Sequence, residues 1–330
     1  MRRAPAHAGS LKPWERLAFA LAFALMAAFV GVITVSAGRA RQQGARPAAP
    51  AVTSESSPAR TGGSPGGTGG QSSAVALDRQ LAVALAPVLL HARGNLAIGV
   101  IDRATGVRSV YNSRHRFPAA SIVKADILAA LLLQHQRAGT VFGAAELGLA
   151  AQMIDGSDGS DGSAASDLWA AAGDTDGVAA ANADLGLRHT TPGQGASWSM
   201  ISTTVADQLR LLTDLTSARS PLTAASRSYE LGLMRRARAG QAWGVPVAAT
   251  ASTSPAVQDG GRPGPRLWAV NSIGVIRHAG QELLVAVLCD GQRSKAAGIV
   301  LDQAAVMAAV TQITPARRGL PWTRRPSWPR

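Results

Sequence analysis

The stretch Phe117-Pro118-Ala119-Ala120-Ser121-Ile122-Val123-Lys124 opens a long apolar helix, which the sequence predicts from about Ser121 to Arg137. On a helix that starts there, Ser121 and Lys124 are three residues apart and share one face. A serine hydroxyl needs a base beside it to act as a nucleophile, and a lysine is that base when its surroundings favour the neutral amine. The spacing therefore predicts acyl transfer, with Ser121 as nucleophile and Lys124 as base.

The setting of Lys124 strengthens this prediction. Ten apolar residues between Ile122 and Leu133 surround it, and a cation is expensive to place among them. The chain has three lysines against thirty arginines, and a proton-accepting amine must be lysine because a guanidinium stays protonated. The alternative is a helix-capping serine beside a lysine whose amine reaches back to water.

Hydrophobic periodicity predicts an α+β domain that opens helix, strand, strand and closes strand, strand, helix around a helical middle. The Gly/Asp-rich breaks within 144–186 divide that middle into several helices. The expected elements are helices at 77–91, 121–137, 144–186 (broken by loops), 204–218 and 294–313, and strands at 96–102, 108–112, 267–277 and 282–288.

The pair Ser121 and Lys124 resembles the S-x-x-K motif of class A β-lactamases and penicillin-binding proteins, and the resemblance extends over residues 75–313. It implies a β-lactamase/transpeptidase-like fold, with an antiparallel sheet flanked by helices and a helical subdomain. It also implies a serine hydrolase that needs no cofactor and is acylated by a β-lactam or by an amide of cell-wall peptide.

The resemblance places a second motif, S-D-N, on a loop between helices, where this chain has two candidate registers. Counting back from Ala164-Ala165 selects Ser160, which we prefer and which would relay the proton, whereas counting on from Met153-Ile154 selects Ser157. In either register Gly stands where the family has Asn. Calcium is a rival interpretation of this Asp-rich loop, but its aspartates recur every third residue rather than at the alternate positions that an EF-hand requires.

The third motif, K-[ST]-G, falls on Gln258-Asp259-Gly260, followed by Gly261, so its lysine is missing. Arg262 or Arg266 is a candidate for the cation that would bind a substrate carboxylate. Gly260 and Gly261 remain the expected oxyanion and substrate-binding residues, because the backbone N–H groups of Ser121 and Gly261 need no particular side chain to stabilise an oxyanion.

A glutamate that activates the deacylating water is also missing, since no Glu occurs between Glu146 and Glu230. Asp174, Asp176 and Asp184 lie in the relevant stretch, and nothing in their spacing selects one. We therefore expect acylation without fast hydrolysis. The alternative is a binding protein of the same fold that recognises wall peptide or a β-lactam without turnover.

The charge lies mainly at the two ends of the chain. Of the formal +13, residues 1–73 and 314–330 hold +11, so the central region shows no basic stripe and nucleic acid is not an expected ligand. Leu17 to Ala37 carries no charge and is long enough to cross a bilayer, which predicts either a cleaved signal peptide or a membrane anchor.

The expected organisation is therefore a cytoplasmic basic segment at 1–16, the membrane or signal segment at 17–37, and a Gly/Ser/Pro-rich disordered linker at 38–74. The catalytic domain follows at 75–313 and a basic flexible tail at 314–330. We expect an extracytoplasmic monomer, anchored or secreted, that binds no metal. Cys289, the single cysteine, is predicted to be inert packing on a buried strand.

Overall fold

The computed structural model describes residues 68–155, 162–191, 197–264 and 267–314. The chain separates into two compact units, 1–64 and 65–330, and every described residue belongs to the second. The predicted membrane segment at 17–37 and the basic tail from 315 onwards lie outside the described residues.

Five strands form one antiparallel sheet in the order β2-β1-β7-β6-β5. These strands are β1 (Leu96–Asp102), β2 (Arg108–Tyr111), β5 (Ala256–Pro263), β6 (Trp268–His278) and β7 (Gln281–Gln292). A two-stranded ladder of β3 (Phe117–Pro118) and β4 (Ser202–Thr203) stands apart from this sheet. Strand β5 is an edge strand, and its free edge faces the candidate site described below.

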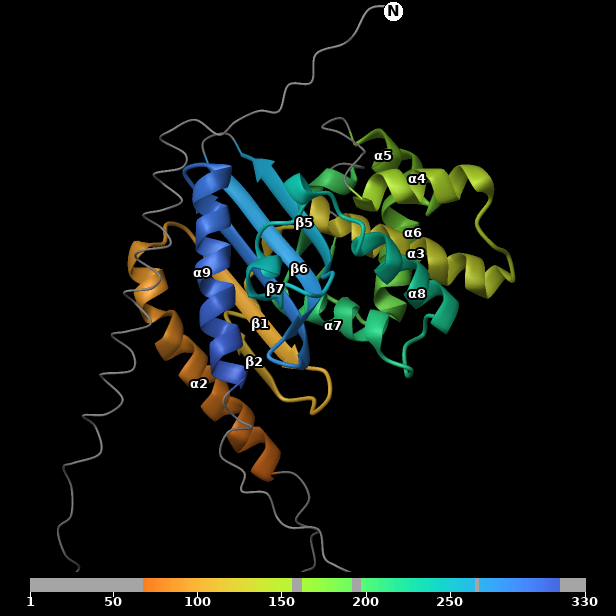
Figure 1. Cartoon of the computed structure of the whole chain (residues 1–330). Helices are drawn as coiled ribbons and strands as arrows, with labels where there is room; N and C mark the ends of the chain where they lie inside the picture. Colours follow the sequence, from red (N-terminus) through yellow and green to blue (C-terminus); the bar gives the residue numbers. More distant parts are fainter. Residues whose placement is uncertain (1–67, 156–161, 192–196, 265–266, 315–330) are drawn as a thin grey trace, which may run out of the picture. The chain divides into compact units, whose positions relative to one another are not determined.

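Helices cover both faces of the sheet (Figure 1). Two of them, α2 (Thr68–His91) and α9 (Lys295–Ile313), pack against one face. The helical part on the other side comprises α3 (Val123–Ala138), α4 (Ala144–Asp155), α5 (Ser163–Ala171), α6 (Asp174–Asp184), α7 (Val205–Thr216) and α8 (Ala224–Met234).

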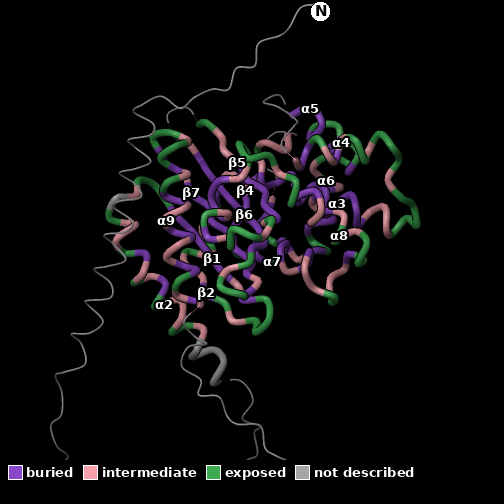
Figure 2. The backbone as a smooth tube through the Cα atoms, viewed as in Figure 1, coloured by how far each residue is buried: buried purple, intermediate pink, exposed green. Residues whose placement is uncertain are grey.

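Strand β7 shows how one sheet serves two cores. Its residues Leu284, Ala286 and Leu288 face the helical part, whereas Val285 and Val287 face α2 and α9. This alternation follows from the two-residue repeat of a strand, and burial of both faces explains why β7 is apolar almost without interruption. Figure 2 shows the resulting band of buried residues through the middle of the domain.

The predicted fold class is confirmed as α+β with an antiparallel sheet and flanking helices. Cys289 is fully buried on β7, as expected. Several boundaries differ, and the largest shift is in α2, which begins at Thr68, nine residues before the predicted start and inside the stretch assigned to the linker. Gly69 and Gly70 are poor helix formers, so the composition gave no reason to extend the helix there.

Candidate active site

Ser121 lies in a single 3-10 turn, η1 (Ala120–Ile122), between strand β3 and helix α3. The preceding residue, Ala120, is buried and has φ = 50°, a left-handed backbone that an L-residue other than glycine seldom adopts. The surrounding structure enforces this turn, because Asn271 Nδ2 donates to the carbonyls of Pro118 (2.8 Å) and Ala119 (2.9 Å). A strained backbone of this kind persists only where the surrounding contacts hold it in place. Such strained residues are common at functional sites.

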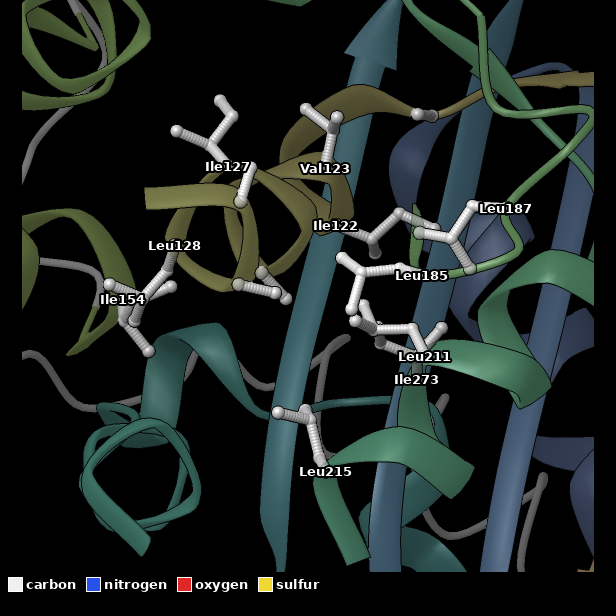
Figure 3. Close-up of a cluster of buried hydrophobic side chains, with 14 of the residues drawn as sticks. Ile122, Val123, Ile127, Leu128, Ile154, Leu185, Leu187, Leu211, Leu215 and Ile273 are labelled. Carbon is white, nitrogen blue, oxygen red and sulfur yellow. The ribbon is translucent and has the colours of Figure 1, made fainter. Parts of the chain in front are cut away.

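Hydrophobic packing fixes the other side of the turn. Ile122 and Val123, which follow Ser121, are fully buried. Ile122 lies beside Leu185 and Leu187 in the core between the sheet and the helical part (Figure 3). Ser121 itself stays half-exposed, so the fold buries its neighbours and presents the serine.

Lys124 lies in the first turn of α3, where the residues from Val123 to Leu133 are all buried. Its side chain is only 6% exposed, and its Nζ lies 5.6 Å from the ring centroid of Trp198. Ser121 and Lys124 line the same pocket, so the structure brings together the two residues that the sequence paired. The remaining lining residues are Met153, Ile154, Gln241, Gln258 and Asp259.

Strand β5 forms the wall opposite Lys124. Gln258 Nε2 donates to the backbone carbonyl of Ser121 at 3.3 Å. A Cβ atom on Gly260 would lie 2.6 Å from the backbone nitrogen of Ser121, so only glycine allows this approach. A Cβ atom on Gly261 would instead meet the side chain of Lys295, at 3.3 Å. Gln258 and Gly260 therefore lie beside Ser121.

Arg262, one candidate for the missing substrate cation, already braces the site. Its Nη1 donates to the carbonyl of Ser199 at 2.9 Å, and its Nη2 contacts Met200 Sδ at 3.0 Å. It thereby ties β5 to the 3-10 turn η2 (Trp198–Met200), whose Trp198 faces Lys124. The other candidate, Arg266, lies outside the described residues.

The loop that is predicted to carry the second motif follows α4 in the chain. Ser157 and Ser160 both lie in 156–161, outside the described residues, as do two aspartates of the calcium alternative. The loop nevertheless starts at the site, because Met153 and Ile154 at the end of α4 line the pocket. Within the described ranges no three His, Cys, Asp or Glu side chains are placed to hold a metal ion.

The three aspartates considered for deacylation lie elsewhere. Asp174, Asp176 and Asp184 belong to α6, and none of them lines the pocket. Asp184 pairs instead with Arg137 on the surface. A carboxylate that does line the pocket is Asp259 on β5.

The surroundings of Asp259 were not anticipated from the sequence. Its carboxylate accepts hydrogen bonds from the backbone N–H of Trp243 and the Ser272 hydroxyl, and burial raises its pKa to about 7. The positive charge of Lys295 opposes that rise. Lys295 Nζ lies 4.0 Å from the ring centroid of Trp243, a cation–π distance. The scarcity of lysine was the only sequence signal that pointed to this residue.

A second group of buried acids lies beneath the site. Asp126 of α3 is completely buried, and Gln208 Nε2 of α7 donates to its two carboxylate oxygens at 3.2 and 3.3 Å. Burial raises the pKa of Asp126 to about 8. Burial also raises the pKa of Glu230 on α8 well above its ordinary value, and the nearby Asp126 adds to the effect. Burial therefore favours the protonated form of both acids.

Comparison with known proteins identifies the fold. A class A β-lactamase from Bacteroides cellulosilyticus aligns with a TM-score of 0.60 and 14% identity over 72% of this chain and 98% of that one. A single-site mutant of the class A β-lactamase of the last common ancestor of Gram-negative bacteria aligns with a TM-score of 0.58 and 22% identity. The alignment covers 73% of this chain and 100% of that one. A β-lactamase from Xanthomonas campestris aligns with a TM-score of 0.57 and 21% identity, over 71% of this chain and 97% of that one.

No protein-family model and no curated protein sequence matches the chain. The similarity therefore lies in the fold, at an identity where sequence comparison finds nothing. The chain has a divergent class A β-lactamase-like fold, as the S-x-x-K motif and the order of elements predicted.

Proposed function

On this β-lactamase-like fold, we propose that the domain is a serine acyl-transfer protein acylated at Ser121 by a β-lactam or by an amide of cell-wall peptide. The observation that carries the proposal is the pocket in which Ser121 and the buried Lys124 lie together, with Gly260 closely packed behind the serine nitrogen. A cation is costly to bury, so its position beside a nucleophile supports a chemical role.

In the proposed reaction Ser121 Oγ bonds to the carbonyl carbon of the amide while Lys124 takes the hydroxyl proton. The C–N bond then breaks, and the nitrogen recovers a proton through Ser160. The negative oxygen formed in between would be stabilised by the backbone N–H groups of Ser121 and Gly261. The close approach of β5 to the Ser121 nitrogen supports this arrangement.

A second candidate, a non-catalytic protein of the same fold that binds wall peptide or a β-lactam, is favoured by the third-motif positions. Gln258 places an amide where the family has a lysine, and it is engaged with the Ser121 carbonyl. No glutamate is among the pocket-lining residues that the structure describes. If the first candidate is right and Ser121 is acylated, the acyl-enzyme would lack the usual base for its hydrolysis and would persist.

Wall peptide lies outside the cytoplasmic membrane, and the apolar segment at 17–37 would deliver the domain there. We propose an extracytoplasmic monomer, either secreted or held by that segment, with residues 38–67 as its tether.

A fluorescent penicillin tests the proposal. The full chain is incubated with the probe, denatured and separated on a gel, alongside Ser121→Ala and the control Ser252→Ala, which changes an exposed serine in a turn. Acylation predicts a covalent band in the unchanged chain and in the control, and no band in Ser121→Ala. No labelling over hours by any common β-lactam would favour the binding protein, and turnover of nitrocefin that survives Ser121→Ala would contradict both candidates.

A further inference from the structure

Helices α2 and α9 lie side by side (Figure 1), and each exposes large aliphatic side chains. We call this surface, with the exposed residues that follow, the α2–α9 face. Val75 is 58% exposed, Val83 71% and Leu90 83% on α2, and Val300 is 58% exposed on α9. Large aliphatic side chains exposed together on one face mark an interaction site more often than singly scattered ones do.

The α2–α9 face also lacks exposed carboxylates. Each helix has one acidic residue, and both turn inward: Asp78 accepts a hydrogen bond from the Val110 N–H at 2.7 Å, and Asp302 is completely buried. The outer positions of α9 carry only small or uncharged side chains, whereas a helix facing water ordinarily carries charges there. Arg79, exposed on α2, is basic.

Because α9 carries few charges, its mean hydropathy is 1.5. This value and its length of 19 residues make α9 a candidate membrane span. It does not span a membrane in this fold, because its inner residues, including Leu301, Val306 and Val310, pack in the core against the sheet. Only its outer side is available to a partner.

The sequences that precede α2 and follow α9 in the chain indicate which partner this face meets. The N-terminal end of α2 and the C-terminal end of α9 lie at the same end of the domain (Figure 1). Residues 315–330, directly after α9, contain five arginines and two tryptophans without an acidic residue. Residues 38–67, which precede α2, contain four arginines against one glutamate and follow the apolar segment at 17–37. Arginine binds anionic headgroups, and tryptophan favours the interface between lipid and water.

We propose that the α2–α9 face docks on the surface of an anionic lipid bilayer. Val83, Leu90 and Val300 enter the interfacial region. The candidate active site is built on the opposite face of the sheet, so docking leaves the Ser121 pocket open to the wall. This inference concerns a different surface and does not depend on the proposed reaction.

Fluorescent probes at single cysteines test the docking. The native Cys289 is fully buried and does not react in the folded chain, so Val83→Cys and Val300→Cys take an environment-sensitive probe separately. Val141→Cys is the matched control, because Val141 is 86% exposed between α3 and α4, away from the α2–α9 face. The full chain with one probe is mixed with vesicles that contain a lipid-attached quencher. One set of vesicles contains phosphatidylglycerol and the other does not.

Docking predicts blue-shifted emission and strong quenching for probes at 83 and 300 on vesicles that contain phosphatidylglycerol, with weaker effects on neutral vesicles. The probe at 141 should remain as in water. Equal signals at all three positions would show that the tether alone holds the domain and would overturn the proposal. A blue shift that appears without vesicles and grows with protein concentration would assign the face to a second copy of the chain, and would overturn it as well.

Discussion

Replacing Asp126 by asparagine is expected to stabilise the domain at neutral pH. Asp126 is completely buried, and burial raises its pKa from 3.8 to about 8, against the opposing effect of its hydrogen bond with Gln208. The negative charge of Asp207 contributes to the rise. In the unfolded chain the carboxyl ionises near its ordinary pKa, so folding at pH 7 must take up a proton. Asparagine needs none, and its amide can still accept the hydrogen bond from Gln208 Nε2.

The size of the effect follows from proton linkage. The folded pKa lies above the unfolded one, so the stability that Asp126 contributes is complete below pH 3.8 and is lost as pH rises through about 8. Each pH unit in that window lowers the free energy of unfolding by about 1.4 kcal/mol. At pH 7 the accumulated loss is on the order of 4 kcal/mol, which sets the upper limit of the gain from Asp126→Asn.

Urea unfolding between about pH 5 and pH 8 measures this effect, with tryptophan fluorescence as the signal. The stabilisation by Asp126→Asn should be smallest at the acidic end and should grow steadily with pH. Asp167→Asn, at an exposed position, is the control and should show no such trend. A variant less stable than the unchanged chain at pH 7, or a difference that does not change with pH, would refute the reasoning.

Three further changes test the site itself. Lys124→Arg replaces the amine by a guanidinium that stays protonated and cannot accept the serine proton, so labelling by penicillin should slow by about 100-fold or more. Gly260→Ala places a methyl group 2.6 Å from the Ser121 nitrogen, and should abolish labelling and lower stability by about 1–3 kcal/mol in urea. Asn271→Ala removes both hydrogen bonds that hold the turn before Ser121, and should cost about 1–3 kcal/mol and slow labelling. Unchanged labelling in any of the three would contradict the role given to that residue.

Local patterns were sufficient for much of the fold. Strand β1 has the predicted bounds, Leu96–Asp102, because a short apolar run ends at a turn that contains Gly106. The burial of Lys124 also followed from its apolar neighbours. Both features depend on residues close together in the chain, so the pattern around them is enough to predict them.

Contacts between segments that are far apart in the chain could not be predicted from local sequence patterns. Asp126, Gln208 and Glu230 come from three helices, and no local pattern shows that they meet beneath the active site. The same holds for Lys295 and Asp259, which only the packing of α9 behind β5 brings together. The hydrogen bond from Arg262 to the backbone of η2 also joins segments that are far apart in the chain. The sequence therefore suggested Arg262 for the substrate carboxylate, whereas in the structure it binds the Ser199 carbonyl.

Acylation of Ser121 is the central claim, and peptide mapping tests it most directly. Trypsin cleaves after Arg116 and Lys124, and the peptide between them, Phe117–Lys124, contains Ser121 as its only hydroxyl side chain. After incubation of the full chain with a penicillin, this peptide should gain the mass of the whole drug, because opening of the β-lactam ring releases no leaving group. An unmodified peptide 117–124, or an adduct found on another peptide, would contradict the account.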